Sequence, residues 1–356
     1  MKIGIMTFHW AANYGAVLQS YALAKHLEQA GHDVCDIDYL PRRSIWTLRF
    51  FDVYLRRFAN LQMVPKFRRF RKRYLRLSPK TYHNYKNLLS IQNTYDAVIA
   101  GSDQIWNESF LMTAEKEPTL SYFLDFLPDD VCRLSYAASF GSNEIPDGVK
   151  RHALAALKKF DAISVREENA AEFLADEGLS AVTVCDPTLL LGPEGYKTLV
   201  QGCCDQKKVA LFNFMLRKGR SSSDDTESFL KNEVFAEKAN LGKEILSVEQ
   251  WLWTLKNSDF VVTDSFHCTV FAILFHKPFL AVNDKDCAMN ARIKTLTQKL
   301  GLEHRVVDCF DRKKICEILE DDKFDWTAVD RRREQWAAES AAFLREALAQ
   351  CNREEL

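Results

Sequence analysis

Short apolar runs alternate with helical segments along nearly the whole chain, and this alternation constrains the fold more than any other feature. An apolar run at residues 2–8 precedes helical apolar spacing over 17–30, and a second apolar run follows at 33–39. A strand, helix and strand in this order predict parallel strands joined by a right-handed crossover. The N-terminal part is therefore expected to be a doubly wound α/β lobe.

The same alternation continues and then restarts, which indicates two domains. In the first part we expect strands at 97–100, 134–138, 162–165 and 182–185, and helices at 150–159 and 167–176. Turn residues at 192–195 precede the restart, where we expect strands at 209–214, 260–263 and 279–282, and helices near 248–256 and 268–275. A chain of 356 residues also exceeds the usual size of a single core. We expect an N-terminal lobe at 1–190, a C-terminal lobe at 191–325, and a final helix at 326–356 that packs across the lobes.

Composition excludes several classes of protein. Lys and Arg number 48 against 49 Asp and Glu, a net charge of -1, so no global field favours nucleic acid. A hydrophobic content of 47% is that of a globular protein. The N-terminus lacks the pattern of a secretory signal, and no apolar stretch reaches the roughly 20 residues that span a bilayer. We expect a cytoplasmic location.

The ten cysteines are scattered without a CxxC pair. No two candidate Cys or His ligands keep the spacing of a structural zinc site. We therefore expect most cysteines to be buried apolar thiols, and we expect neither a metal nor a bound cofactor.

Residues 42–80 are strongly basic, with 13 Lys and Arg against one acid, Asp52. Interleaved Phe and Tyr residues favour one or two amphipathic helices, so the segment is a basic helical insertion in the first lobe. Its basic side chains could simply face water, or they could bind anionic lipid headgroups or a pyrophosphate-linked acceptor. In the second case the protein would work at the inner face of the membrane. Single-stranded nucleic acid is a weaker third alternative, and we expect no nucleic-acid partner.

Polar motifs follow several predicted strands. The loop at 8–16 joins the first strand to its helix, where backbone N–H groups could receive an anion. Alternatively, Asn13 caps the helix and Gly15 serves backbone shape. After the strand at 97–100, Asp103 is a candidate base or hydroxyl acceptor, or else a helix cap. Arg166 follows another strand and could hold a carboxylate or phosphate, or could pair with Glu167, Glu168 or Asp186.

The sharpest motif is at 260–269, where a strand runs into Thr263, Asp264 and Ser265 before a helix that begins near His267. A histidine at such a position can donate and accept protons near neutral pH, and Asp264 could orient it. A lone histidine at a helix start is more often structural. The polar residues directly before it favour a functional role.

Taken together and in this order, these blocks resemble the polysaccharide pyruvyl transferase family. The blocks are Thr7-Phe8-His9, Asn13-Tyr14-Gly15-Ala16-Val17-Leu18-Gln19, Gly101-Ser102-Asp103-Gln104-Ile105-Trp106-Asn107, Ser135-Tyr136-Ala137-Ala138-Ser139-Phe140-Gly141, Val165-Arg166-Glu167, Asp186-Pro187-Thr188 and Thr263-Asp264-Ser265-Phe266-His267. They cover nearly the whole chain, and several long motifs in register are far more specific than any one of them.

The resemblance implies two Rossmann-like lobes in a GT-B-like arrangement with a cleft between them. It implies phosphoenolpyruvate as donor and co-substrate, a saccharide hydroxyl pair as acceptor, which could be lipid-linked, and a pyruvyl ketal as product in exopolysaccharide biosynthesis. The residues expected to carry the chemistry are His267, Asp103 and Asp264. The donor-binding positions are Arg166, Arg292 and Ser265, and the acceptor-binding positions are Asn13, Tyr14, Gly15, Gln104 and Trp106.

One departure from the family pattern matters. Some members carry arginine two residues before the histidine, where this chain has Ser265, so one positive charge is missing. Arg292 or a residue of the basic segment could replace it. Two alternatives stay open: a nucleotide-sugar-dependent glycosyltransferase of the same fold, and a non-catalytic sugar-binding protein.

Overall fold

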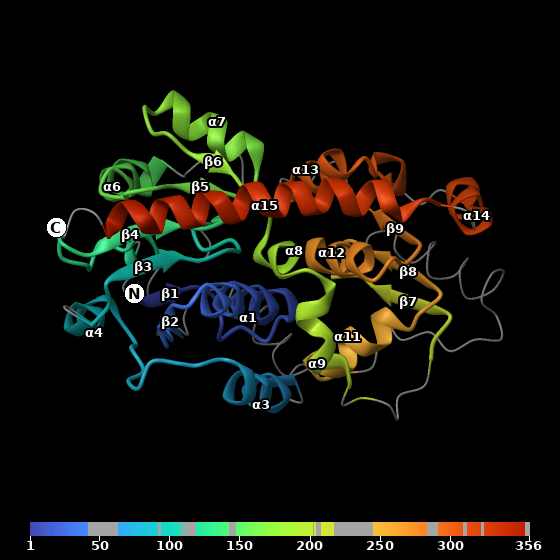
Figure 1. The fold of residues 1–356 in the computed structure, drawn as a ribbon, viewed down its shortest axis with the longest axis horizontal. Helices are drawn as coiled ribbons and strands as arrows, with labels where there is room; N and C mark the ends of the chain where they lie inside the picture. Colours follow the sequence, from blue (N-terminus) through green and yellow to red (C-terminus); the bar gives the residue numbers. More distant parts are fainter. Residues whose placement is uncertain are drawn as a thin grey trace. The chain divides into compact units, whose positions relative to one another are not determined.

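In a computed structural model, the chain forms two compact units (Figure 1). Unit 1 is Met1–Leu191 together with Trp336–Leu356, and unit 2 is Gly192–Gln335. The structure describes residues 1–41, 63–91, 94–107, 111, 119–141, 147–201, 203, 208–216, 245–282, 291–308, 312–321 and 324–352. The expected basic insertion thus lies in part, at 42–62, outside the described residues.

Unit 1 is built on a parallel sheet of β1 (Lys2–Met6), β2 (Asp33–Asp36), β3 (Ala97–Ala100) and β4 (Cys132–Ser135), in the order β2-β1-β3-β4. Isolated bridges from Leu134 to Ala162 and from Ala138 to Val165 continue it toward β5 (Ser164–Val165), which pairs with β6 (Val182–Thr183). At the other edge, Leu77 and Tyr82 bridge to Asp36 and Tyr39, so a later segment covers β2. All the predicted strands of this lobe form, and most end one to three residues early.

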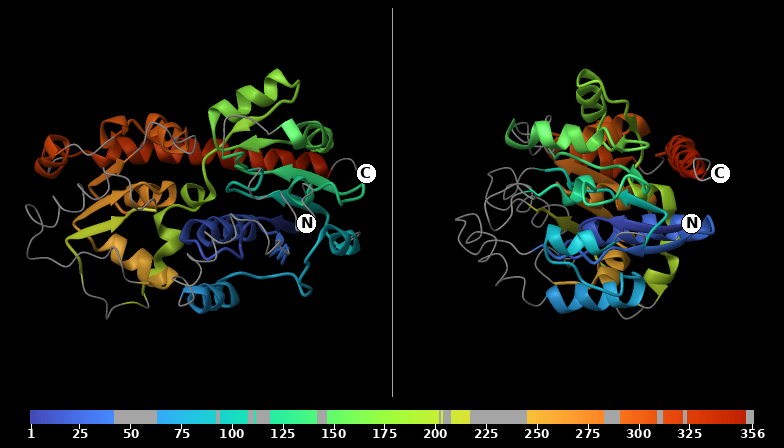
Figure 2. Two further views of the ribbon diagram at one scale, coloured as in Figure 1. Left: turned by 180° about the vertical axis from the view of Figure 1, so that it is seen from behind. Right: turned by 90° about the vertical axis from the view of Figure 1, so that its left-hand side faces the viewer.

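Side chains of the strands alternate between two cores. Ile3 and Ile5 of β1 pack with Leu23 of the first helix and with Leu344 and Leu348 near the C-terminus. Met6 and its neighbours on the other face pack with a second set of helices and loops. Figure 2 shows these helices on both sides of the unit 1 strands. The lobe is therefore doubly wound, as predicted.

The helices of unit 1 begin where local capping allows. Helix α1 begins at Tyr14 rather than at the expected residue 17 because the Asn13 side chain caps it. The helices are α1 (Tyr14–Gln29), α3 (Met63–Tyr74), α4 (Tyr85–Leu88), α6 (Asp147–Leu157), α7 (Glu168–Asp176) and α8 (Pro187–Leu191), with short 3-10 turns at Leu89–Ile91 and Ser121–Phe123.

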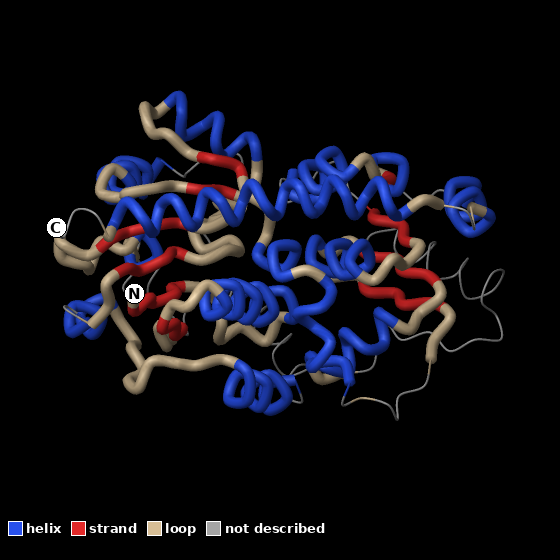
Figure 3. Tube along the Cα trace, viewed as in Figure 1, coloured by secondary structure: helices blue, strands red, loops and turns tan. Residues whose placement is uncertain are grey.

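Unit 2 repeats the architecture with strands in simple sequence order. Its parallel sheet has the order β10-β9-β8-β7, from β7 (Leu211–Phe214), β8 (Phe260–Thr263), β9 (Phe279–Val282) and β10 (Val306–Val307). Its helices are α9 (Lys197–Gln201), α11 (Val248–Lys256), α12 (Phe266–Leu274), α13 (Ala291–Leu300) and α14 (Arg312–Glu320), with 3-10 turns at Pro193–Tyr196 and Glu303–Arg305. Figure 3 shows its strands side by side between helices.

The aromatic core of unit 2 lies between its sheet and two of its helices. Trp251 of α11 packs edge-on against Phe212 of β7 and Phe271 of α12, at ring-centroid distances of 5.9 and 5.8 Å. On the other face, Ile318 of α14 joins Leu211 and Val262. The final helix, α15 (Trp326–Cys351), contributes residues up to Gln335 to unit 2 and the rest to unit 1.

The cysteines correct one expectation. Cys132 of β4 and Cys351 at the end of α15 form a disulfide across 219 residues of sequence, so these two are not thiols. An oxygen of Asp161 lies within 4.8 Å of both sulfurs, but the bond between the sulfurs leaves them no thiolate for a metal. Cys35, Cys185, Cys268 and Cys316 are thiols, and Cys185 and Cys268 are buried as expected. Among the described helices, none has the length and apolar character to cross a membrane.

Candidate functional site

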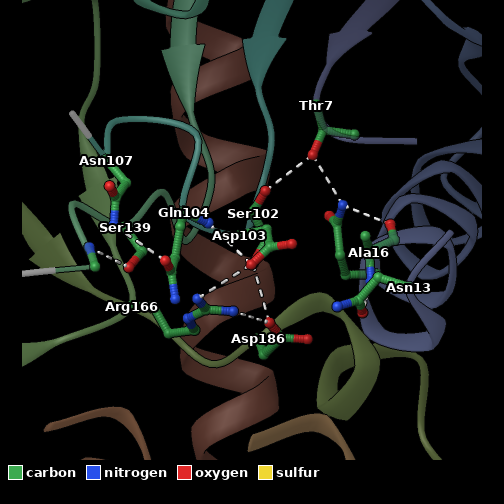
Figure 4. A network of polar contacts seen from close by, with 12 residues as sticks. Thr7, Asn13, Ala16, Ser102, Asp103, Gln104, Asn107, Ser139, Arg166 and Asp186 are labelled. Atoms are coloured by element: carbon green, nitrogen blue, oxygen red, sulfur yellow. Dashed lines mark hydrogen bonds and ion pairs between the residues drawn. The ribbon is translucent and has the colours of Figure 1, made fainter. Parts of the chain in front are cut away.

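The strand order of unit 1 reverses between β1 and β3, and ligands of open α/β sheets bind beyond the carboxyl ends of strands at such a point. The two loops that leave these strands are tied together. The Thr7 hydroxyl donates to the Ser102 carbonyl at 2.9 Å, and the Gln19 amide donates to the Thr7 hydroxyl at 2.8 Å (Figure 4). The loops are therefore held in fixed positions beside the switch point.

In the loop before α1, Asn13 caps the helix, which was one of the two predicted alternatives. Asn13 is exposed, and its side-chain oxygen accepts the N–H of Ala16 at 3.2 Å. Gly15 is buried in the first turn, and the Tyr14 ring packs against Phe67 of α3 with centroids 5.1 Å apart. Of these three predicted acceptor-binding residues, Asn13 alone presents an exposed side chain.

Asp103 lies directly after β3 with a backbone φ of 80°, a left-handed conformation that is uncommon outside glycine. Neighbouring backbone groups hold it there: its carbonyl accepts the N–H of Ser139 at 3.0 Å and that of Ile105 at 2.8 Å. Its carboxylate accepts the N–H of Gln104 at 2.9 Å and remains 16% exposed. A strained residue held by its surroundings at a strand end is a common property of functional sites.

Gln104 and Trp106 serve packing around Asp103. The Gln104 side-chain oxygen accepts the Asn107 amide at 3.1 Å. Gly141 lies against both side chains with a φ of 67°, a left-handed conformation that favours glycine. Trp106 corrects an expectation. It is 0% exposed, its indole N–H donates to the Tyr122 carbonyl at 3.0 Å, and its ring stacks on Phe123. It is a core residue and not an acceptor-binding one, because no face of the ring is open.

Arg166 is the centre of a buried ionic cluster. Its Nη1 donates to Asp186 at 2.9 Å, and its Nη2 lies 3.8 Å from Asp103 (Figure 4). Its Nε lies 3.6 Å from Glu167. Burial by itself lowers the pKa of Arg166, but Glu167, Asp186 and Asp103 together raise it above its ordinary value. The guanidinium therefore stays charged although it is only 2% exposed.

Hydroxyl groups complete this cluster. Ser102 and Thr188 donate to the two carboxylate oxygens of Asp186 at 2.9 and 2.6 Å, and Ser139 donates to Glu167 at 2.7 Å. A phosphate or carboxylate brought to Arg166 would have to approach three carboxylates. The geometry does not support direct donor binding by Arg166, and it matches the ion-paired alternative.

A second polar cluster in unit 1 was not predicted. His9 is 0% exposed, with Nε2 3.0 Å from a carboxylate oxygen of Asp38 and Nδ1 3.2 Å from the Thr7 carbonyl. Asp36 is fully buried and accepts the Ser20 hydroxyl at 2.5 Å, and burial raises its pKa to about 6. The only sequence signal for this cluster was a histidine within a strand-end motif.

In unit 2, the motif after β8 is fixed by backbone contacts. The Thr263 hydroxyl donates to the Phe214 carbonyl at 2.6 Å and accepts the N–H of Ser265 at 3.0 Å. The Ser265 hydroxyl accepts the N–H of Cys268 at 3.4 Å and caps α12, which therefore begins at Phe266. Asp264 accepts the N–H of Leu216 at 2.6 Å, a contact that anchors the end of β7.

His267 and Arg292 of unit 2 both lie against the ring of Phe266, although 25 positions separate them in sequence. His267 is in the first turn of α12, 7% exposed, with its ring centroid 5.1 Å from that of Phe266. Arg292, in the first turn of α13, places its guanidinium 5.9 Å from the centroid of the same Phe266 ring. A cation and a histidine therefore flank one aromatic ring where two helices begin. Helix N-termini carry partial positive charge, so this region suits an anion beside a group that can transfer protons.

A model of the family described as polysaccharide pyruvyl transferase matches residues 13–286. The chain belongs to the polysaccharide pyruvyl transferase family. The matched range holds every predicted site residue except Arg292. The family is one of transferases in polysaccharide biosynthesis, and the protein is accordingly a pyruvyl transferase by family.

Solved structures with a similar fold are UDP-GlcNAc 2-epimerases. The enzyme from Neisseria meningitidis bound to UDP-GlcNAc is 10% identical with a TM-score of 0.57, and the match covers 98% of this chain and 100% of that one. The Rickettsia bellii enzyme is 10% identical with a TM-score of 0.56, and the match covers 99% of this chain and 96% of that one. The Methanocaldococcus jannaschii enzyme is 12% identical with a TM-score of 0.54, and the match covers 92% of this chain and 95% of that one. At this identity the likeness shows the fold alone, which is of the GT-B type with two Rossmann-like lobes. No curated protein sequence matches the chain.

Proposed function

We propose that the protein transfers the pyruvyl group of phosphoenolpyruvate to two hydroxyls of a saccharide, forming a ketal and releasing phosphate. The observation that carries the proposal is the pairing of His267 and Arg292 around Phe266, in a chain of the pyruvyl transferase family. It offers a proton-transfer group and a cation around the same aromatic ring. The reaction needs both.

The proposed chemistry balances without a cofactor. A proton adds to the CH2 carbon of the enol, and a sugar hydroxyl attacks the adjacent carbon and loses its proton. The bond to the phosphate oxygen then breaks, and a second hydroxyl adds to the same carbon to close the ketal. The two sugar hydroxyls together lose two protons. One of these balances the proton that the CH2 carbon gained, and the other is carried away by the released phosphate. His267 transfers the protons, and Arg292 with the first turns of α12 and α13 holds the donor anion.

The unit 1 residues receive separate roles in this proposal. Asp103, with its partly exposed carboxylate, and the exposed amide of Asn13 position acceptor hydroxyls. Arg166 is assigned as a positioning residue, because its guanidinium pairs with Asp186 and lies 3.8 Å from the Asp103 carboxylate.

The melting temperature tests the donor. Phosphoenolpyruvate at 100 times its dissociation constant should add about 2.7 kcal/mol of stability, a shift on the order of a degree or more for a chain of this size. Arg292→Gln should abolish this shift. Lys294→Gln is the matched control, because it removes an exposed charge from the same helix and should retain the shift.

A second function has one observation in its favour. The Neisseria structure of similar fold is described as bound to UDP-GlcNAc. If nucleotide sugars stabilise the protein and phosphoenolpyruvate does not, the protein is a nucleotide-sugar-dependent glycosyltransferase and the proposal fails. If saccharides bind but no donor yields phosphate, a non-catalytic sugar-binding role replaces both.

A further inference from the structure

Helix α3 separates its apolar and basic residues onto opposite sides. Phe67 and Phe70 are buried, and their rings lie 5.1 Å from Tyr14 and 6.2 Å from Tyr21 of α1. These contacts fix which side of α3 faces unit 1. In Figure 1, α3 lies at the outer margin of unit 1, beside α1.

The opposite side of α3 is a cluster of exposed cations. With 3.6 residues per turn, the positions one, two, five and six residues after Phe67 project away from the buried side. These positions form the basic face, which consists of Arg68, Arg69, Lys72 and Arg73. All four side chains are exposed, and they occupy two successive turns.

The basic face is not neutralised within the part of the chain that the structure describes. Nearby carboxylates serve other cations: Asp33 pairs with Arg76, and Asp38 faces the half-buried Arg71. Arg73 lies over the Tyr74 ring, a contact that leaves its charge in place. Like charges four residues apart, as at Arg68 and Lys72, destabilise a helix. Cations in the last turn gain from the helix dipole, but Arg68 and Arg69 lie a turn earlier.

The position of the aromatics decides which kind of anion fits. Proteins that bind single-stranded nucleic acid stack bases on exposed aromatic rings. In α3 the rings of Phe67 and Phe70 are buried against α1, and the ring of Tyr74 packs on Tyr21 and Phe70. The four positions of the basic face itself therefore carry charge and no aromatic ring. For the same reason α3 cannot insert an apolar side into a bilayer, as an interfacial helix does. A flat array of anionic headgroups complements a face of this kind.

We propose that the basic face of α3 docks the protein onto an anionic phospholipid bilayer by electrostatic attraction at headgroup level. The proposal does not depend on pyruvyl transfer. Each basic residue near an anionic surface strengthens binding roughly five-fold, so four together strengthen it by a factor on the order of several hundred. Because the interaction is electrostatic, it weakens as salt shortens the screening length from about 10 Å at 0.1 M to about 3 Å at 1 M.

Sedimentation with vesicles tests the proposal. We expect the full-length protein to bind vesicles of phosphatidylcholine with phosphatidylserine, to bind phosphatidylcholine alone far more weakly, and to be released by about 1 M salt. The test variant combines Arg68→Gln, Arg69→Gln, Lys72→Gln and Arg73→Gln. It should lose vesicle binding by about a hundred-fold or more and keep the wild-type melting temperature, because all four side chains are exposed.

A control variant removes the same net charge from scattered exposed positions. It combines Arg151→Gln, Lys158→Gln, Lys313→Gln and Arg331→Gln. We expect it to bind vesicles nearly as wild type does, because it leaves the basic face intact.

Three results would overturn the proposal. The first is a wild-type protein that does not bind phosphatidylserine-containing vesicles at low salt. The second is equal loss of binding in the test and control variants, which would make net charge and not the basic face responsible. The third is a protein that binds a single-stranded oligonucleotide through α3 but not vesicles.

Discussion

The strand-end loops of the two units are built from similar residues and organised in opposite ways. In unit 1 the charged side chains pair with one another: Arg166 lies within 4 Å of three carboxylates, and hydroxyls donate to Asp186 and Glu167. In unit 2 the polar residues before α12 satisfy backbone groups, and His267 and Arg292 each lie against the ring of Phe266. A charged residue in a motif can therefore support a site instead of acting in it.

The comparison separates two arginines that looked alike in sequence. Arg166 follows a strand and is part of a family motif, but its guanidinium is ion-paired with Asp186, Glu167 and Asp103. Arg292 lies outside the residues that the family model matches, yet its guanidinium lies over the Phe266 ring, which the His267 ring also contacts. Loss of Arg166 should therefore damage folding, and loss of Arg292 should damage donor binding.

The largest effect is expected at His267. In His267→Asn, kcat should fall about 10²- to 10⁴-fold because a proton-transfer group is lost, while stabilisation by phosphoenolpyruvate persists. Phosphate release in a steady-state assay measures the change. His152→Asn, at an exposed position of unit 1, is the control and should turn over normally. Near-normal turnover in His267→Asn would remove this residue from the mechanism.

Arg166→Met should lower the free energy of unfolding by about 3–5 kcal/mol, because three carboxylates would be left without their buried cation. Arg292→Met should change it by only about 0.5 kcal/mol. Urea unfolding of both variants gives the comparison. A stable Arg166→Met protein that had lost phosphoenolpyruvate binding would reverse our assignment and make Arg166 the donor ligand.

Asp36 should make unit 1 lose stability as pH rises. Its pKa of about 6 in the folded protein lies above the ordinary 3.8, so the folded state holds the proton between these values and the unfolded state does not. The contribution is fully present below about pH 4 and is lost by about pH 6, an effect of about 3 kcal/mol. Asp36→Asn should flatten this part of the urea-unfolding profile, whereas Asp176→Asn, at an exposed site, should not. Identical slopes in wild type and Asp36→Asn would refute the assignment.

The smallest effects concern the two helix caps. Asn13→Ala and Ser265→Ala should each cost about 1 kcal/mol of stability, because each cap accepts a backbone N–H of its helix. Asn13→Ser and Ser265→Asn keep a capping side chain and should restore that stability. If Asn13→Ser restores stability but leaves the KM for the acceptor raised, Asn13 contacts the acceptor. If it restores both, the residue is only a cap.

The sequence predicted the fold well and the roles of individual site residues less well. Its strands formed within a few residues of the expected bounds in both units. Helix starts moved because a cap at Asn13 or Ser265 begins a helix before the apolar spacing does. Trp106 was misassigned because a motif shows which residue follows a strand, and does not show that its ring turns into the core.

The sequence by itself determined the alternation of strands and helices and the family, because hydrophobic periodicity and contiguous motifs are local properties of a chain. Only the tertiary structure decided which distant residues meet. It placed Cys351 against Cys132 and Arg292 against Phe266, and it surrounded Arg166 with Asp103 and Asp186. Strand order and helix packing create these contacts, and neither can be read from spacing along the chain. The same holds for α3, whose basic residues are evident in the sequence but whose outward side is set by Phe67 and Phe70 against α1.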